Sequence, residues 1–448
     1  MKKNSSNSST STSMTLKAVA FAALALTLSA CSEKSSVDPQ QQIGQAPVLP
    51  AAQDFLVPPM QVPKGVGWQG DAHPTVASGL RIEKIADGLM HPRQLLTLPN
   101  GDVLVVESNG PGTEAITTPK QLIAGLVKSR SGKGGKGGNR ITLLRKDAAT
   151  GKWAQHVYIE KLNSPFGLQL IGNVLYVADT DRIVKFAYVE GATRMADGGT
   201  EFTDLPSTIN HHWTKSLLAS PDGKKLYVGV GSNSNITENG LAVEYRRAAV
   251  LEVDVASGGS RIFASGIRNP TGLQWEPKTG KLWAIANERD EIGADLVPDY
   301  LTSVQEGGFY GWPYSYYGQH VDDRVQPQRP DLVAKAIKPD FAVGSHVAAL
   351  GLLFYTGTQL PAMYQGGAFI GEHGSWDRSP LSGYKVSYVR FVDGKPTGTT
   401  VPVVTGFTSQ DEKQLFGAPV GLAQTADGAL LIADDVGNTV WSVTGAAP

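Results

Sequence analysis

Cysteine is almost absent from this sequence, and so is any excess of charge. Cys31 is the only cysteine among 448 residues, so the folded part of the chain can contain no disulfide bond. Forty Lys and Arg residues face 41 Asp and Glu residues, and the net charge of −1 gives no support to nucleic-acid binding. No Gly-x-Gly-x-x-Gly follows a strand, and neither a Walker loop nor a Gly-x-Ser-x-Gly elbow is present. These absences count against nucleotide-dependent enzymes and triad hydrolases.

The N-terminus has the pattern of a bacterial lipoprotein signal. Basic residues precede an apolar stretch from Ala18 to Leu26, which is too short to remain as a membrane-spanning helix. Leu28-Ser29-Ala30-Cys31 then resembles a lipobox, in which the cysteine is acylated and becomes the first mature residue. The next residue, Ser32, is not the aspartate associated with retention in the inner membrane. We therefore expect a signal peptide over 1–30 and a lipoprotein of the bacterial envelope, anchored to the outer membrane with its folded part in the periplasm. The alternative is an ordinary secretory signal with an incidental cysteine.

Two further regions follow the signal. Residues 31–66 are rich in Ser, Gln and Pro with little periodicity, which predicts a flexible tether. The remaining 67–448, about 380 residues, exceed what one ordinary core supports, yet no second linker divides them. Fifty-one glycines and 27 prolines indicate many turns and few long helices. The choice is between fused domains and one modular architecture.

A short phrase recurs along the folded region: a turn of Asp, Asn or Gly followed by alternating apolar residues. The copies are PNGDVLVVES from Pro99, IGNVLYVADTDRIVKF from Ile171, SPDGKKLYVGVGS from Ser220, PKTGKLWAIANE from Pro277, ADGALLIADDVGNTVWSV from Ala426 and a weaker MYQGGAFIGEHGS from Met363. Each copy predicts a turn and a strand of period two. Six copies at intervals of roughly 50 to 85 residues predict an all-β fold, a six-bladed β-propeller. A pair of β-sandwiches is the competing interpretation.

One copy lies between a cationic loop and an acidic loop. Arg268 and Asn269, in the phrase GIRNPTGLQW, offer a guanidinium fork and an amide that suit carboxylates and carbonyls. Glu288, Asp290 and Asp295 follow the strand and cluster the oxygen ligands that calcium prefers. A structural turn and a solvated acidic loop are the alternatives.

Other candidate residues open or close the remaining blades. His212, in the phrase HHWTKSLLASPDG, is a candidate general base, and Lys215 follows it. Arg378 and Lys385 follow the weaker copy and can both reach an anion, although such residues are usually solvated. The Lys/Gly segment 128–139 predicts a mobile loop, a flexible spacer rather than a contact to lipid phosphates or polysaccharide.

Taken together, these phrases resemble the quinoprotein sugar dehydrogenases with a six-bladed propeller, and specifically their L-sorbosone dehydrogenase branch. The phrases that carry the resemblance, which extends over about residues 79–443, are HHWTKSLLASPDGKKLYV, GIRNPTGLQW, NERDEIGADLVPDYLT, GGFYGWPYSYYG, HGSWDRSPLSGYKV and PVGLA. The resemblance implies pyrroloquinoline quinone (PQQ) as cofactor and calcium as its partner. It also implies a sugar or sugar aldehyde as substrate and a quinone or cytochrome as electron acceptor.

The resemblance also assigns roles to residues. His212 takes the position of the base that removes the hydroxyl proton, and Arg268 and Asn269 line the same mouth. Arg378 and Lys385, with Lys215, are the nearest matches to the cations that hold the cofactor carboxylates. In related enzymes calcium is held largely by backbone carbonyls of the loop that is here 287–295.

Two positions depart from the family pattern. Asp377 stands where asparagine is expected, and Ala418 stands near an expected arginine. Two other functions stay open, namely a calcium-dependent propeller lactonase and a non-catalytic propeller that binds glycans or proteins.

Overall fold

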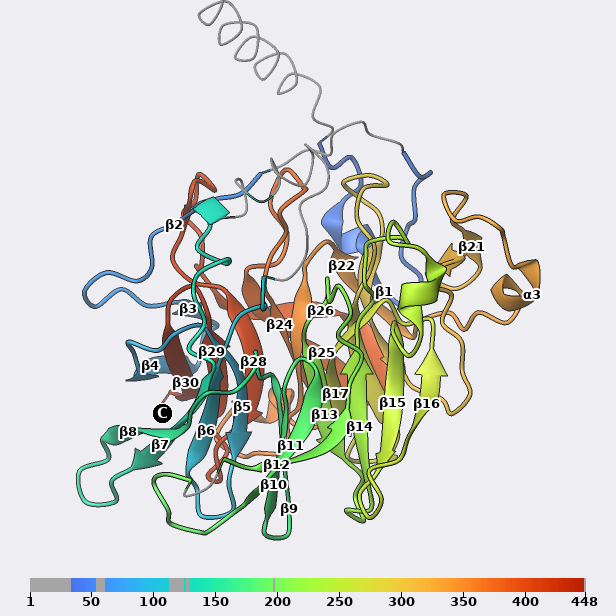
Figure 1. Cartoon of the computed structure of the whole chain (residues 1–448). Coiled ribbons are helices and arrows are strands. Elements are labelled where there is room, and N and C mark those ends of the chain that lie inside the picture. Colours follow the sequence, from blue (N-terminus) through green and yellow to red (C-terminus); the bar gives the residue numbers. More distant parts are fainter. Residues whose placement is uncertain (1–33, 54–60, 113–124, 126–128, 196–197, 447–448) are drawn as a thin grey trace, which may run out of the picture.

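Six sheets surround a common axis in the computed structural model, which describes residues 34–53, 61–112, 125, 129–195 and 198–446 (Figure 1). The predicted signal peptide and Cys31 lie outside the described residues. In the described part, no helix is both long and apolar enough to cross a membrane.

Each sheet is one antiparallel propeller blade, which confirms the predicted six-bladed all-β fold. Blade 1 contains β5 (Pro92–Thr97), β6 (Val103–Glu107), β7 (Arg140–Lys146) and β8 (Trp153–Ile159), and blade 2 contains β9 (Gly167–Ile171), β10 (Val174–Ala178), β11 (Arg182–Ala187) and β12 (Thr200–Asp204). Blade 3 contains β13 (Lys215–Ala219), β14 (Lys225–Val230), β15 (Ala249–Asp254) and β16 (Ser260–Ser265), and blade 4 contains β17 (Asn269–Trp275), β18 (Leu282–Asn287), β19 (Pro298–Ser303) and β22 (Phe341–Ser345). Blade 5 contains β23 (Ala349–Phe354), β24 (Ala368–Glu372), β25 (Lys385–Val392) and β26 (Lys395–Thr405), and blade 6 contains β28 (Pro419–Gln424), β29 (Leu430–Asp434), β30 (Thr439–Gly445) and β4 (Leu80–Ala86).

Short elements decorate these blades. They are β1 (Ile43–Gly44) on blade 4, β3 (Thr75–Val76) on blade 5, the pairs β2 (Lys64–Gly65) with β27 (Gln414–Leu415) and β20 (Ser315–Tyr316) with β21 (His320–Val321), and the helical turns η2 (Pro39–Gln42), η3 (Leu241–Glu244), η4 (Ala362–Tyr364) and α3 (Pro330–Val333).

The recurring phrase of the sequence forms the second strand of every blade. The apolar phrase before it forms the first strand, so each copy is a hairpin whose turn is set by local residues. The chain closes the ring by pairing β4 from its N-terminal part with β30 near its end. First strands of neighbouring blades contact one another all around the axis. Closure of the ring leaves few sheet edges exposed. Because all six blades belong to this one ring, the fold is the single modular architecture and not a set of fused domains.

The core lies between the blades, because each sheet packs against a neighbour on both faces. Val103 to Val106 are all fully buried, so β6 has no solvent face and its apolar run is continuous. Large side chains such as Trp283 and Trp441 fill the spaces between adjacent sheets.

The first strands begin, and the second strands end, at one face of the ring, which we call the mouth face. Contacts between successive blades recur there. Ser108 donates its hydroxyl hydrogen to the carbonyl of Pro165 at 2.5 Å, and the amide of Ser232 donates to the carbonyl of Arg268 at 2.9 Å. Residues that open one blade therefore lie beside residues that end the hairpin of the blade before it.

The N-terminal strap, residues 34–44, differs from the predicted tether. Ser36 donates its backbone N–H to Asp295 Oδ2 at 2.7 Å, and the buried Gln42 donates its side-chain amide to the carbonyl of Asp295 at 2.9 Å. Ile43 and Gly44 add β1 to the edge of β22. Ser and Gln are typical of linkers, but here their polar groups find buried partners on the propeller. This part of 31–66 is therefore docked, not free.

Buried carboxylates end several second strands, and Asp179 of blade 2 allows a test. One oxygen accepts a hydrogen bond from Asn163 N at 3.1 Å, while the other is buried without a hydrogen bond from the described residues. Burial raises the pKa of Asp179 to about 7. Because the folded pKa exceeds the unfolded one, the stability contributed by this carboxyl is complete below about pH 4 and is lost as the pH rises through about 7.

Asp179→Asn is therefore expected to raise the thermal unfolding temperature at about pH 8 and to change it little below about pH 4, as measured by calorimetry. Asp204→Asn, on an exposed edge of the same blade, is the control and should show no such pH difference. Equal shifts at both pH values for Asp179→Asn would contradict a buried, uncharged carboxyl.

Candidate active site at the mouth of the propeller

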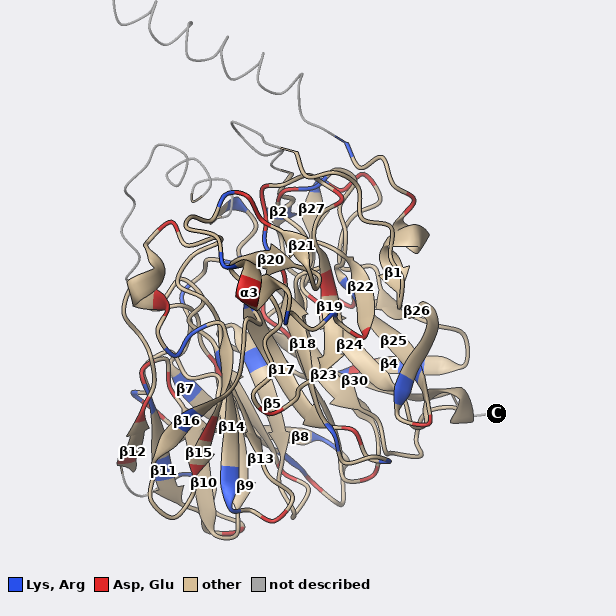
Figure 2. Ribbon diagram, turned by 90° about the vertical axis from the view of Figure 1, so that its right-hand side faces the viewer, with Lys and Arg blue, Asp and Glu red and all other residues tan. Residues whose placement is uncertain are grey.

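Basic and acidic residues are interspersed along the ribbon in Figure 2. The buried charges of the mouth face form a more selective arrangement around His212, Arg268 and Asp435.

His212 lies in the loop before β13 with its ring fixed by blade 3. Its Nδ1 is 2.9 Å from the carbonyl oxygen of Ser232 and 3.0 Å from the hydroxyl of the same residue. A proton on Nδ1 satisfies the carbonyl and leaves the lone pair on Nε2. Burial, together with the charge of Arg268 and the proximity of His211, holds the pKa of His212 well below 6.5. The imidazole is therefore neutral at physiological pH and can accept a proton.

Arg268 and Asn269 lie beside His212, as predicted. Gly231, the residue after β14, sits between His212 and the Asn269 amide so closely that no Cβ fits there. Asn269 Nδ2 donates to Asn287 Oδ1 at 3.2 Å, and its Oδ1 is buried without a hydrogen-bond donor among the described residues. An unpartnered buried amide oxygen at this position is suited to a ligand.

The guanidinium of Arg268 is held on three sides. It donates to the carbonyl of Glu288 at 2.6 Å and to both the carbonyl and the side-chain oxygen of Asn235 at 3.1 and 3.0 Å. Asp290 Oδ2 is 3.7 Å away. Arg268 is thus a rigid positive charge next to His212.

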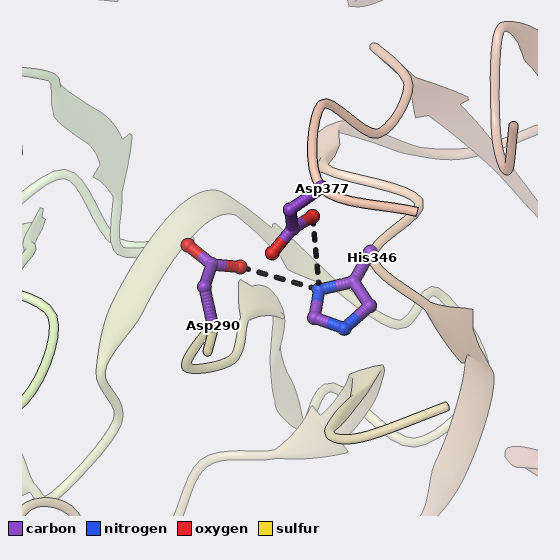
Figure 3. A group of neighbouring side chains, drawn as sticks. All are labelled: Asp290, His346 and Asp377. Carbon is purple, nitrogen blue, oxygen red and sulfur yellow. Dashed lines mark hydrogen bonds and ion pairs between the residues drawn. The ribbon is translucent and has the colours of Figure 1, made fainter. Parts of the chain in front are cut away.

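Asp290 belongs to a triad with His346 and Asp377, and the three residues come from different loops (Figure 3). His346 Nδ1 is 3.2 Å from Asp290 Oδ1 and 3.6 Å from Asp377 Oδ1, and His346 Nε2 is 3.0 Å from the carbonyl of Gly293. Burial lowers the pKa of His346, but the carboxylates of Asp377 and Asp290 outweigh it and raise the pKa to about 10. A protonated imidazole between two carboxylates is an ion triad. Because calcium prefers oxygen ligands, the triad as it stands is a poor calcium site.

The other two predicted metal ligands point elsewhere. Glu288 Oε2 is 3.2 Å from Arg289 Nε. Asp295 accepts hydrogen bonds from the strap and is 3.3 Å from Arg378. Of the three predicted carboxylates, Asp290 is the most exposed, at 24% of its side chain. The carbonyls of residues 288, 290 and 292–295 accept hydrogen bonds from protein donors, which leaves these oxygens fewer lone pairs for a cation.

Lys215 and Arg247 bring buried positive charge to the same region. Lys215 is fully buried, and its Nζ donates to Asn210 Oδ1 at 3.1 Å and to the carbonyl of Trp213 at 3.0 Å. Arg247 donates to backbone carbonyls, among them that of His212 at 2.9 Å, and its Nε is buried without an acceptor among the described residues. Burial lowers the pKa of Lys215 well below its ordinary value and that of Arg247 to about 10. No described carboxylate forms a salt bridge with either cation.

A second cluster, which sequence reasoning missed, surrounds Asp435 at the end of the hairpin of blade 6. Arg93 Nη1 donates to Asp435 at 2.5 Å, and His373 Nε2 lies 2.9 Å from the same carboxylate. Despite burial, His373 and Arg93 hold the pKa of Asp435 well below its usual value. Burial lowers the pKa of His373 to about 4, so this ring is neutral. Arg93 comes directly after the proline of its first strand, whereas Arg268 comes two residues before Pro270, so an alignment of the first strands gave no signal for it.

Arg378 and Lys385, predicted to hold the cofactor, have protein partners in the structure. Arg378 is buried and donates to the carbonyl of Ala294 at 2.7 Å and to the hydroxyl of Ser35 at 2.7 Å. Lys385 Nζ is 3.6 Å from the buried carboxylate of Glu372. The structure therefore does not bring these two residues together with His212. At Ala418, where an arginine was expected, the backbone N–H donates to Asp434 at 2.8 Å.

The Lys/Gly segment differs from the predicted mobile spacer in the part that is described. Lys133 crosses to blade 5, where Nζ donates to the carbonyls of His373 and Gly374 at 2.8 and 3.0 Å. It also lies over the ring of Tyr384 at 4.4 Å from the centroid. Residues 129–139 thus form part of the mouth. The hydrogen bonds of Lys133 offset the conformational entropy that the glycine-rich loop loses when it is ordered.

A recess of about 300 Å³ lies between this loop and blade 3. Its lining consists of Asn109, Gly110, Pro111, Gly112, Gly134, Gly135, Asn210, His211 and Trp213. Trp213 also packs edge-on against Phe166, with Arg93 5.6 Å from its ring centroid. An aromatic ring beside amides and an imidazole is a surface that suits a polar ring such as a sugar.

Comparison with known proteins places this geometry in context. A family model described as TrAA12-like matches residues 74–306 and 322–446. Aldose sugar dehydrogenase YliI of Escherichia coli is 25% identical over 313 residues, which span 65% of this chain and 77% of that protein. The pyrroloquinoline quinone-dependent pyranose dehydrogenase of Coprinopsis cinerea is 22% identical over 430 residues, which span 82% of this chain and 54% of that protein.

Solved structures agree with the fold. The holo form of the pyranose dehydrogenase PQQ domain from Coprinopsis cinerea has a TM-score of 0.67 and 20% identity, covering 86% of this chain and 100% of that one. A calcium structure of a Trichoderma reesei carbohydrate-active enzyme of family AA12 has a TM-score of 0.67 and 19% identity, covering 88% of this chain and 99% of that one. At these identities the likeness concerns the architecture.

Proposed function

This chain belongs to the TrAA12-like family, and from that premise we propose that it is a PQQ-dependent sugar dehydrogenase. The observation that carries the proposal is the neutral imidazole of His212 beside the fixed guanidinium of Arg268, in a region where Lys215 and Arg247 form no salt bridge with a described carboxylate. Relatives named as sugar and pyranose dehydrogenases support the same chemistry.

The mouth fits an anionic cofactor. Lys215 and Arg247 are buried and contact neutral acceptors, so an anion would relieve the cost of burying their charge. Arg93 Nε, Arg247 Nε and Asn269 Oδ1 are buried without a hydrogen-bond partner in the described part of the chain, and they offer further donors and an acceptor. These residues are the ones we assign to cofactor binding, with Lys215 and Asn269 retained from the sequence.

His212 acts as the base in this proposal. Its Nδ1 is committed to Ser232, so Nε2 receives the proton of the substrate hydroxyl. PQQ, when bound, would accept a hydride from the substrate carbon that carries this hydroxyl. Arg268 stabilises negative charge that develops nearby, and because it is already held by Glu288 and Asn235 it needs no reorganisation to do so. The recess beside Trp213 orients the sugar.

Calcium enters the proposal through relatives, one of which was solved as a calcium structure. Within this chain, Asp290 is the predicted carboxylate best placed to contribute, because its side chain is partly exposed whereas those of Glu288 and Asp295 are buried. The chain's own residues fit the anionic cofactor better than they fit the cation.

The substrate is an aldose or a sugar aldehyde of the sorbosone type, oxidised at a hydroxyl-bearing or aldehyde carbon, and a quinone or cytochrome accepts the electrons. The lipobox at Cys31 attaches the mature protein to the membrane of the bacterial envelope, with the propeller in the periplasm.

Reconstitution tests the function. Purified protein is mixed with PQQ and calcium, and we expect a cofactor absorbance band and reduction of an artificial dye on addition of aldoses. The control omits calcium and adds a chelator. Absence of both the band and dye reduction would rule out the dehydrogenase, and hydrolysis of lactones would favour the propeller lactonase.

A further inference from the structure

The N-terminal strap begins on the mouth face, at the rim between blades 4 and 5. Ser35 donates its hydroxyl hydrogen to Asp295 Oδ1 at 2.6 Å and its backbone N–H to the carbonyl of Ser379 at 2.9 Å. The loop of Asp295 follows β18 and that of Ser379 follows β24, and both strands end at the mouth face. Arg378, which is buried, donates to Ser35 from below at 2.7 Å. The strap is therefore fixed to the propeller at Ser35, near its first described residue.

The length of chain before this fixed point is short. Cys31 stands four residues before Ser35, and four residues span at most about 14 Å when fully extended. A free tether over 31–66 would instead reach about 120 Å and would leave the propeller without a preferred orientation.

We propose that the mouth face, at the rim of blades 4 and 5, rests on the phospholipid headgroup surface, with the opposite face of the propeller turned to the aqueous phase. This inference depends on the proposed acylation of Cys31. A lipid attached there holds Ser35 within about 14 Å of the bilayer, while the strap prevents the propeller from turning away. Blades 1 and 2 lie across the ring from this rim, so the recess beside Trp213 keeps an entrance to water.

Two lysines at opposite ends of the propeller provide matched sites for labels. Lys413 lies on the mouth face beside β2, and Lys224 lies in the turn between β13 and β14 at the far face. Their side chains are 80% and 78% exposed, and each pairs with an aspartate two residues earlier, at 3.4 and 3.8 Å. Both turns have the same hydrogen bond from a serine hydroxyl to that aspartate.

Lys413→Cys and Lys224→Cys each introduce one free thiol, since Cys31 is the only native cysteine and is blocked once acylated. The full-length acylated proteins are labelled with a fluorophore and reconstituted into phospholipid vesicles whose headgroups carry a nitroxide quencher. We expect the Lys413→Cys label to lose most of its emission and the Lys224→Cys label to keep it. Equal quenching of both labels, or stronger quenching at Lys224→Cys, would overturn the proposed orientation.

Two further variants separate the orientation from the functions on which it rests. Insertion of a 20-residue Gly/Ser spacer directly before Lys34 keeps the anchor but should abolish the difference between the labels; a persisting difference would contradict the short reach. The Cys31→Ser protein should no longer bind the vesicles. If it binds as tightly as the native chain, Cys31 does not carry the lipid anchor and the proposed orientation is wrong as well. Dye reduction in detergent is expected to be the same for all variants, so a failure of sugar oxidation registers independently.

Discussion

Replacement of His212 by alanine is expected to lower kcat by about 10²- to 10⁴-fold while PQQ still binds with nearly unchanged affinity. The reason is that Nδ1 of this imidazole is committed to Ser232, which leaves Nε2 as the proton acceptor, whereas the cofactor contacts come from other residues. Steady-state sugar oxidation measures kcat, and titration of the absorbance band measures cofactor affinity.

His211→Ala is the matched control, because its ring lies 4.7 Å from that of His212 and belongs to the same loop. We expect a much smaller loss of kcat, since His211 lines the recess without the Ser232 contact that fixes a tautomer. Comparable losses in the two variants, or normal turnover by His212→Ala, would remove His212 from the role of base.

The pH profile gives a second readout of the same assignment. The base must be unprotonated, and burial with the charge of Arg268 holds the pKa of His212 well below 6.5. The value of kcat/KM should therefore stay level as the pH falls from about 8 to about 6, with no step from this histidine at its ordinary pKa.

Lys215→Met is expected to weaken cofactor binding about 10- to 100-fold, the size of one lost charge-assisted hydrogen bond, without lowering the unfolding temperature of the free protein. Lys215 is fully buried and contacts only neutral oxygens in the described structure, so its charge opposes folding until an anion binds. Burial lowers the pKa of Lys215 in the folded state. The folded protein therefore loses stability relative to the unfolded chain as the pH falls and the amine becomes protonated. The stability gained from Lys215→Met should for that reason be larger at lower pH.

Lys225→Met serves as the control on the same hairpin. Lys225 is partly exposed and pairs with Asp254 at 2.8 Å, so its loss should leave cofactor affinity unchanged and reduce stability only slightly. A folded Lys215→Met protein that binds PQQ as tightly as the native chain would show that the buried cation has no part in cofactor binding.

The strands of the propeller were predictable because their signals are local. A turn such as Ser220-Pro-Asp-Gly and the alternation that follows it lie within about ten residues, and the second strand of every blade begins where the recurring phrase predicted. His212, Arg268 and Asn269 could be placed at the start of their blades for the same reason, since each occupies a fixed place in a blade phrase; their roles stay predictions.

The partners of these residues were not predictable, because they come from distant blades. The contact of Arg93 with Asp435 joins residues 342 positions apart, and that of Ser35 with Asp295 joins residues 260 apart. In the sequence, Asp295 was a candidate metal ligand and Arg378 a candidate cofactor ligand. In the structure both residues bind the N-terminal strap, and the Ser and Gln composition of the strap did not predict these contacts.

By itself, the sequence determined the repeating hairpins, the single cysteine and the places of the histidine and arginine that open blades 3 and 4, because each depends on neighbours along the chain. Only the tertiary structure decided which charges meet at the mouth. In the closed ring, His212 lies beside Arg268 and Asp290 pairs with His346. Lys215 and Arg247 have no carboxylate partners among the described residues. These partners depend on burial and long-range packing, which the spacing of residues along the sequence does not reveal.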